Sequence, residues 1–198
     1  MKALHLDIPT HMETERLHLR CYGPGDGQWY FAASQTNRNH LRRYESDNVI
    51  TTIQNEEQAE VLVRDLATEW AAHRCFFMGA FDKQSGEFVA QIYIGPVDRD
   101  LPEFQIGYFA DVDHEGHGYV SEAVSAALQF IFEHLHAHRA RLECDDSNVR
   151  SYAVAERCGM VKEGHIRENK KNSDGTFSGK LYYGLLKSEF EARKPEVA

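Results

Sequence analysis

A glycine-containing segment, residues 115–120, joins a strand pattern to the start of a long helix pattern. Within it, Gly116 and Gly118 flank His117. Glycine lets the backbone approach a ligand closely, and the first turn of a helix offers unpaired N–H groups and the positive end of the helix dipole. The segment therefore predicts an anion-binding turn, to which a protonated His117 would add charge. An ordinary tight turn with a solvated histidine is the alternative, and the Lys-Ser/Thr pair of a P-loop does not follow.

A second polar pair, Asn148 and Ser151, lies further along the chain. Asparagine is a favoured helix N-cap residue, and a short helix pattern follows Asn148 and ends before Gly159. Positions three residues apart share one helical face. We therefore expect an amide and a hydroxyl side by side at the start of this helix.

Carboxylates that could act in proton transfer occur in two strand patterns. Glu103 and Gln105 share one face of the strand at residues 103–110, because side chains alternate along a strand. Glu143 lies in the strand at residues 139–144. A positioned glutamate can act as a general base, and each of these is equally readable as an ordinary ion-pair or strand-edge residue.

Strand and helix patterns position these residues, and they alternate unevenly along the chain. Alternating apolar residues predict strands at residues 16–21, 76–81, 87–94, 103–110, 139–144, 160–169 and 177–186. Helical spacing predicts helices at residues 28–34, 38–44, 55–72, 118–136 and 148–157. Asp174-Gly175 is a strong hairpin turn signal. The pattern predicts a mixed sheet in an α/β or α+β domain, not a doubly wound fold.

Length and composition fit one globular domain, residues 1–198, with a core at about 13–188. No stretch approaches the ~18 apolar residues of a membrane span, and the N-terminus is charged too early for a secretory signal. With 22 basic and 31 acidic residues, the net charge of −9 disfavours nucleic-acid binding. The four cysteines lack metal-ligand spacing. We expect a cytoplasmic protein with free thiols and neither a metal nor a membrane partner.

Five motifs, in order along the chain, resemble the GNAT superfamily of acetyl-CoA-dependent N-acetyltransferases. The likeness is strongest to its branch of ribosomal-protein N-terminal-alanine acetyltransferases. The motifs are ETERLHLR at 13–20, the strand, turn and helix at 105–124, LECDDSNVRS at 142–151, VAERCGM at 154–160, and EG at 163–164 with the hairpin that follows. The resemblance covers nearly the whole chain.

The resemblance implies a GNAT-like single domain with a central, mostly antiparallel mixed sheet of about seven strands, flanked by helices. In this family the fourth and fifth strands splay apart and the pantetheine arm of acetyl-CoA inserts between them. By position, the binding residues are Tyr108, Phe109, Ala110, Gly116, His117, Gly118, Tyr119, Val120, Ser121 and Asn148. The sequence departs from the family at Glu115, where Gln or Arg is usual, and we expect its side chain to point outward.

The resemblance also implies direct attack of a primary amine on acetyl-CoA. Ala155 stands where many relatives have the tyrosine that protonates the leaving thiolate, so Ser151 is the candidate acid. Glu143 and Glu103 are candidates for the base. The acceptor stays open between a protein N-terminus, a polyamine, an aminoglycoside and an amino-acid-like amine. A coenzyme A-binding module without turnover is the alternative function, and a homodimer is common among similar proteins.

Overall fold

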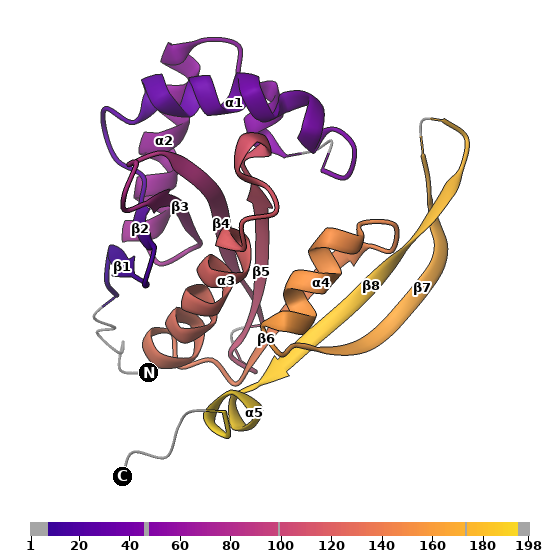
Figure 1. The fold of residues 1–198 in the computed structure, drawn as a ribbon. Coiled ribbons are helices and arrows are strands. Elements are labelled where there is room, and N and C mark those ends of the chain that lie inside the picture. Colours follow the sequence, from indigo (N-terminus) through magenta and orange to yellow (C-terminus); the bar gives the residue numbers. More distant parts are fainter. Residues whose placement is uncertain (1–7, 46–47, 99, 173, 194–198) are drawn as a thin grey trace.

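The computed structural model describes residues 8–45, 48–98, 100–172 and 174–193. At its centre is an eight-stranded sheet in the order β1-β2-β3-β4-β5-β6-β8-β7, and all neighbours pair antiparallel except β5 and β6 (Figure 1). The strands are β1 (His11–Glu13), β2 (Leu17–Cys21), β3 (Phe76–Asp82), β4 (Phe88–Asp98), β5 (Glu103–Ala110), β6 (Arg139–Asp145), β7 (Val161–Lys171) and β8 (Phe177–Leu186). The predicted mixed sheet is confirmed.

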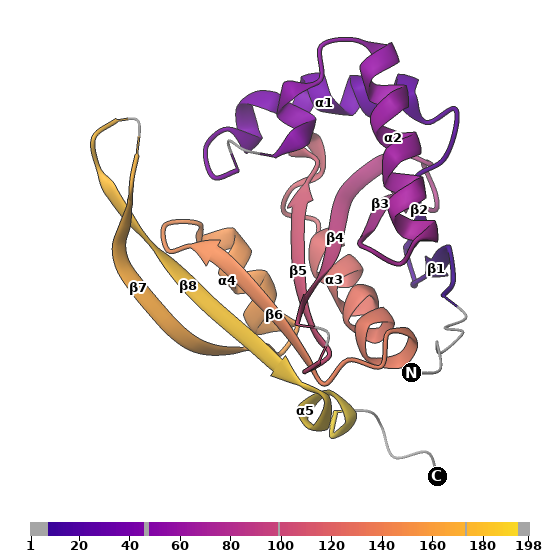
Figure 2. The same cartoon turned by 180° about the vertical axis from the view of Figure 1, so that it is seen from behind.

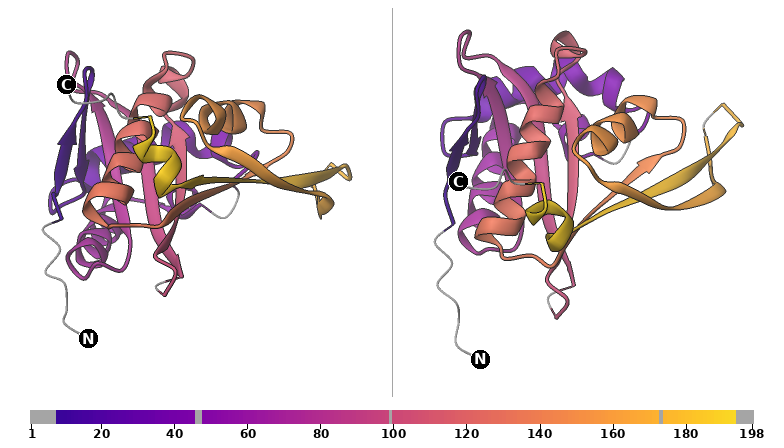
Figure 3. Two further views of the ribbon diagram at one scale, coloured as in Figure 1. Left: turned by 90° about the horizontal axis from the view of Figure 1, so that it is seen from below. Right: turned by 60° about the horizontal axis from the view of Figure 1, so that its bottom comes forward.

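Helices cover both faces of this sheet. They are α1 (Gly27–Leu41), α2 (Glu56–Ala71), α3 (Tyr119–Gln129), α4 (Val149–Arg157) and α5 (Lys187–Glu191), with short turns η1 (Val49–Thr52), η2 (Val112–His114) and η3 (Phe130–His134). Figures 1 and 2 show α3 and α4 over one face and α1 and α2 over the other. Figure 3 shows the β7–β8 hairpin projecting beyond the rest of the sheet. No helix in the described ranges is long and apolar enough to cross a bilayer.

Two hydrophobic clusters hold these layers together. The larger packs α3 against the sheet and includes Ile92, Ile106 and Val124. The smaller lies under α1 and α2 and includes Tyr30, Val63 and Phe109. Because side chains alternate along β5, Ile106 joins one cluster and Phe109 joins the other. The strand at the centre of the expected site is therefore anchored on both faces.

The structure corrects the sequence prediction in three places. The sheet has eight strands because β1, only three residues long, pairs with β2. One continuous helix, α1, replaces the two expected at residues 28–34 and 38–44. Asn37 lies in the gap between the two expected helices, where its buried side chain donates to the Ala33 carbonyl at 2.9 Å and the helix continues. The helix expected at residues 118–136 ends as α3 at Gln129, followed by the π-helical turn η3.

The parallel pair β5 and β6 separates along its length. Register pairs join Glu103–Arg139, Phe104–Ala140 and Gln105–Arg141 only. Beyond Gln105, β5 keeps its ladder with β4, whereas β6 continues against β8. Within the described chain, residues 106–110 therefore have no strand neighbour on their β6 side. The splay expected from the resemblance is present. The family's fourth and fifth strands correspond to β5 and β6, because the short β1 precedes them in the count.

Candidate active site

The turn after β5 has the backbone that its glycines predict. Gly116 and Gly118 both have φ of +80°, and Gly118 is the N-cap of α3. A side chain is strained in this left-handed region whatever the surrounding space. A Cβ at Gly116 would meet nothing within 4 Å, so the backbone there is open to a ligand. The first N–H groups of α3 follow directly, and helix N-termini favour anions.

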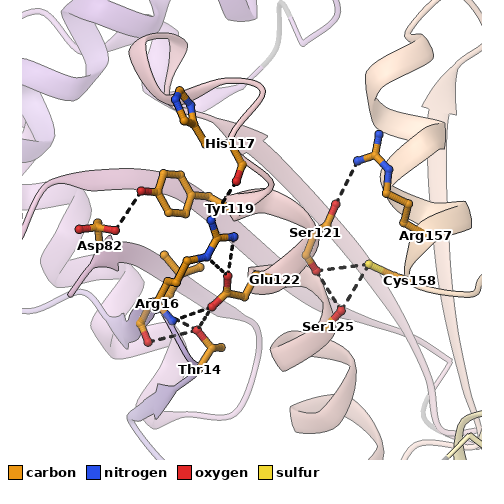
Figure 4. Close-up of polar contacts among 11 residues, drawn as sticks. Thr14, Arg16, Asp82, His117, Tyr119, Ser121, Glu122, Ser125, Arg157 and Cys158 are labelled. Atoms are coloured by element: carbon orange, nitrogen blue, oxygen red, sulfur yellow. Dashed lines mark hydrogen bonds and ion pairs between the residues drawn. The ribbon is translucent and has the colours of Figure 1, made fainter. Parts of the chain in front are cut away.

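A hydrogen-bond network ties this turn to the β1–β2 region (Figure 4). The Arg16 guanidinium pairs with Glu122 at 2.7 Å and donates to the His117 carbonyl at 3.0 Å. It also lies 4.8 Å from the centre of the Tyr119 ring, whose hydroxyl donates to Asp82 at 3.0 Å. Burial alone would raise the pKa of Glu122, but hydrogen bonds, including those from Arg16, hold it below the ordinary value. The turn is thus fixed before any ligand arrives.

A buried polar cluster ties the start of the same loop to α1. Asn37, fully buried, donates to the Asp111 carboxylate at 2.6 Å and accepts from the Val112 N–H at 2.8 Å. His114 lies 2.9 Å from Asp111 and 3.3 Å from Glu87. Burial lowers the pKa of His114, but its contacts with the two carboxylates hold it above the ordinary value. Sequence reasoning missed this cluster, because its members come from three separate segments.

The sequence analysis expected the Glu115 side chain to point outward, but the structure does not turn it fully to solvent. Its carboxylate pairs with Arg150 at the start of α4 and with His40 of α1 at 3.3 Å, and it is 22% exposed. The Arg150 guanidinium offsets the negative charge beside the anion-binding turn. Glu115 therefore joins three elements at the open end of the splay: the loop after β5, α1 and α4.

A further cation, Arg157, stands at the first turn of α3. It donates from the last turn of α4 to the Ser121 hydroxyl at 3.3 Å (Figure 4). The Ser121 carbonyl accepts from the Cys158 thiol at 3.4 Å. The His117 ring stacks on Tyr119 with centroids 6.0 Å apart, while Val120 packs against the larger core cluster. Arg157 was missed from sequence, although it lies in the motif at 154–160.

Tyr108 and Ser151 meet across the splay. The Tyr108 hydroxyl donates to the Ser151 carbonyl at 2.8 Å, and the two hydroxyl oxygens are 3.5 Å apart. Asn148 caps α4 by accepting from the Ser151 N–H at 3.3 Å. Burial raises the pKa of Tyr108 far above its ordinary value. Burial also raises the pKa of the nearby Cys144 thiol to about 11, partly offset by a hydrogen bond with Ser151.

The three residues expected to bind pantetheine differ in the exposure of their side chains. They are Tyr108, Phe109 and Ala110. Phe109 buries its side chain under α1 and α2, so it could contact a cofactor only through its backbone. Its neighbours Tyr108 and Ala110 are only partly buried. All three lie on the unpaired stretch of β5, whose backbone groups have no described strand partner on the β6 side. This free edge, together with the anion-binding turn, fits an extended amide-containing chain that ends in a diphosphate.

The two glutamates predicted from sequence are both ion-paired. Glu143 contacts Lys180 at 2.9 Å and Arg141 at 3.3 Å. Glu103 contacts Arg139 at 2.9 Å, at the end of β5 that still pairs with β6. At least one basic side chain therefore already occupies each of these carboxylates.

Two cavities lie on the α1 side of the sheet. The larger, about 910 Å³, runs between α1 and the strands β2 to β4 and includes Trp29 and Phe81 in its wall. Arg20 already lies over the Phe81 ring at 4.8 Å and pairs with Asp26 at 2.7 Å. The smaller cavity, about 230 Å³, borders the splay and is lined by Glu45, Asn48, Val49, Phe77, Gln91, Tyr93, Gly107, Tyr108 and Phe109.

Comparisons with known proteins agree with this geometry. The model of the acetyltransferase (GNAT) domain family matches residues 16–161. The uncharacterized N-acetyltransferase YnaD of Bacillus subtilis is 26% identical over 180 residues, which are 91% of this chain and 99% of YnaD. The ribosomal-protein-serine acetyltransferase of Escherichia coli is 28% identical over 85 residues, which are 43% of this chain and 48% of that protein.

A solved structure has the same fold. The microcin C7 self-immunity acetyltransferase MccE, in complex with acetyl-CoA and AMP, superposes with a TM-score of 0.78 at 15% identity, covering 90% of this chain and 97% of MccE. The match to the family model spans well over half of the chain. The chain therefore belongs to the GNAT family of acetyl-CoA-dependent N-acetyltransferases and is an acyltransferase.

Proposed function

We propose that this protein transfers the acetyl group of acetyl-CoA to a primary amine by direct attack in a ternary complex. The observation that best supports this is the convergence of three features at the splay. They are the anion-binding turn at Gly116 and Gly118, the free edge of β5, and the hydroxyl pair of Tyr108 and Ser151. Holding both substrates in one geometry supplies much of the rate.

The anion-binding turn and the β5 edge would hold acetyl-CoA. The backbone amides of residues 116–121 suit its diphosphate, with Arg157 as an added cation. The free backbone of Tyr108 to Ala110 would pair with the pantetheine amides, and Asn148 fixes the start of α4 beside them. Acetyl-CoA supplies an activated thioester. Backbone N–H groups of β5 can polarise the carbonyl of this thioester.

Ser151 would protonate the departing thiolate. Its hydroxyl donates to that of Tyr108 at 3.5 Å, and the phenol donates to the Ser151 carbonyl. The phenol would turn from this carbonyl to the Ser151 hydroxyl oxygen to return a proton after the thiolate has taken one. Ala155, at the position of the tyrosine found in many relatives, is buried and cannot donate. Glu143 and Glu103 are the base candidates from sequence, and both are held in ion pairs.

A protein N-terminus is the acceptor we favour. An α-amine has a pKa near 7.8, so a fair fraction is free at neutral pH, whereas lysine at about 10.4 is almost wholly protonated. The E. coli relative named as a ribosomal-protein-serine acetyltransferase supports a protein acceptor. The net charge of −9 favours cationic acceptors, so polyamines and aminoglycosides form the second candidate class. We place this activity in one domain, residues 13–188, in the cytoplasm, as monomer or homodimer.

A thiol-release assay tests the proposal. Purified protein and acetyl-CoA are mixed with short peptides beginning with serine or alanine, with spermidine, and with an aminoglycoside. We expect coenzyme A release with at least one amine and faster release with a peptide than with its N-terminally blocked form. Binding of acetyl-CoA in calorimetry without release on any amine would instead indicate a coenzyme A-binding module.

A further inference from the structure

Glu45 lies at the wall of the small cavity beside the splay. It follows the last turn of α1, where its N–H donates to the Leu41 carbonyl at 2.7 Å. Its carboxylate accepts from the Asn48 side-chain amide at 2.8 Å. The same cavity is lined from β5 by Gly107 and Tyr108, so Glu45 faces the stretch of β5 that has separated from β6. The charge of Glu45 is near enough to raise the pKa of Tyr108 slightly further.

The end of α1 reaches over the splay at several points. Tyr44 donates to the Ser147 carbonyl, between β6 and α4, at 3.5 Å. His40, one turn earlier, pairs with Glu115 in the loop after β5. Glu45 is therefore on a segment tied to both sides of the splay, which fixes where its carboxylate stands.

Glu45 differs from the other two carboxylates in its partners. Glu143 and Glu103 each contact an arginine or lysine. For Glu45, no described basic side chain lies within ion-pair distance, and its carboxylate accepts a hydrogen bond from the neutral Asn48 amide. The titratable groups that line the cavity with it are Tyr93 and Tyr108, both neutral at physiological pH. A cationic group entering this cavity would therefore meet one unneutralised carboxylate.

The cavity suits the amine-bearing end of an acceptor. Its volume of about 230 Å³ is below the range of pockets that hold drug-sized ligands. Aromatic side chains, including Phe77 and Tyr93, form much of its wall. Such a space admits one residue or a short alkyl chain and leaves the rest of the acceptor outside.

We infer that Glu45 binds the ammonium group of the acceptor in this cavity and takes up its proton before attack. This inference rests on the proposed function. The ammonium gives one proton to the Glu45 carboxylate, and the free amine forms the new N–C bond as the thioester C–S bond breaks. The second amine proton passes through solvent to the hydroxyl pair of Ser151 and Tyr108, Ser151 gives a proton to the thiolate, and Glu45 returns its proton to solvent between turnovers.

The environment of Glu45 supports such a role. Burial raises the pKa of its carboxyl, and the hydrogen bond from Asn48 only partly opposes this. A higher pKa narrows the gap to an α-amine near 7.8, which makes proton transfer easier. Glu143 and Glu103 are less available to an incoming ammonium group, because basic side chains already contact their carboxylates.

The test compares Glu45→Gln with matched glutamine variants of Glu143, Glu103 and Glu57, in full-length protein with a serine peptide as acceptor. Glu57 is exposed on α2 and serves as the control. We expect Glu45→Gln to lower kcat/KM for the peptide by about 100-fold at pH 6.5, the scale of general-base catalysis. The decrease in kcat/KM should be smaller for Glu143→Gln and Glu103→Gln, and Glu57→Gln should have the wild-type kcat/KM. The affinity for acetyl-CoA should be unchanged in all four variants.

The pH profile separates a proton-accepting role from a structural one. The deficit of Glu45→Gln should shrink above pH 7.8, where the α-amine is already free; a purely structural loss would persist at every pH. Glu45→Asp keeps a carboxylate and should keep the wild-type profile at a lower rate, which decides the matter if the glutamine variant does not fold. A pH-independent deficit, or full activity in Glu45→Gln, would overturn the inference. Failure of the wild type to release thiol would instead reject the proposed function.

Discussion

Tyr108 and Ser151 join two elements that the splay separates, so they act where the two halves of the sheet part. Ser151 was singled out as the candidate acid by the family resemblance. Its place three residues after Asn148 predicted only the helix cap, which is present. Glu45, Arg157 and His40 were not found from sequence. Each reaches the site from an element distant in the chain, and local spacing carries no information about such contacts.

Ser151→Ala is expected to lower kcat by about 100-fold, the scale of general acid catalysis, with little change in KM for acetyl-CoA. Steady-state kinetics with acetyl-CoA varied at a saturating acceptor measure both constants. Ser85→Ala, in the exposed turn between β3 and β4, is the matched control. An unchanged kcat would remove Ser151 from the mechanism.

Tyr108→Phe tests whether the Tyr108 hydroxyl takes part in proton transfer with Ser151. It removes the hydrogen bond to the Ser151 carbonyl, which should cost about 1 kcal/mol of unfolding free energy. If the two hydroxyls pass a proton between them, the double variant with Ser151→Ala should lose little more activity than Ser151→Ala alone. Fully additive losses in kcat would contradict a shared proton path.

At the scale of elements, periodicity closely predicted the bounds of two elements that carry site residues. The strand at residues 103–110 matches β5, and the capped helix at residues 148–157 matches α4 to within one residue. It failed for α1, whose buried face contains Ser34 and Asn37 and whose apolar spacing is therefore broken. The splay could not be derived from periodicity either, because both strands are regular up to the point where they separate. That expectation came from the family resemblance.

The loop after β5 yields a prediction about charge. Glu115→Gln removes a carboxylate beside the anion-binding turn and frees Arg150 and His40 from their ion pairs. We expect a lower KM for acetyl-CoA, by roughly fivefold if the change is worth about 1 kcal/mol. Arg150→Gln should raise the same KM, and added salt should shrink both effects because exposed charges are screened. Equal KM values in wild type and both variants would show that Glu115 does not influence the bound diphosphate.

At the scale of the whole molecule, composition predicted a globular protein with a full hydrophobic core, and its apolar residues form two clusters, one on each face of the sheet. The small cavity beside the splay could not be predicted from composition. Its wall combines Glu45, Tyr93 and Gly107, from three segments whose meeting depends on the sheet order and on the path of α1. The cavity is thus a property of the assembled fold.

The splay also predicts how acetyl-CoA affects stability. The proposed contacts span the α3 and β5 side and the α4 side, so acetyl-CoA should bind the folded protein and not the unfolded chain. At 100 times its Kd, such a ligand adds about 2.7 kcal/mol to the free energy of unfolding, or roughly 5 to 10 °C in Tm for a chain of this size. Differential scanning calorimetry measures the shift, and ADP, which keeps a diphosphate but lacks the pantetheine arm, serves as the control ligand. At equal concentrations a larger shift with acetyl-CoA than with ADP is expected, because only acetyl-CoA can pair with the free edge of β5. Equal shifts would mean that the open stretch of β5 contributes no binding energy, and with it the reason for placing the thioester beside Ser151 would be lost.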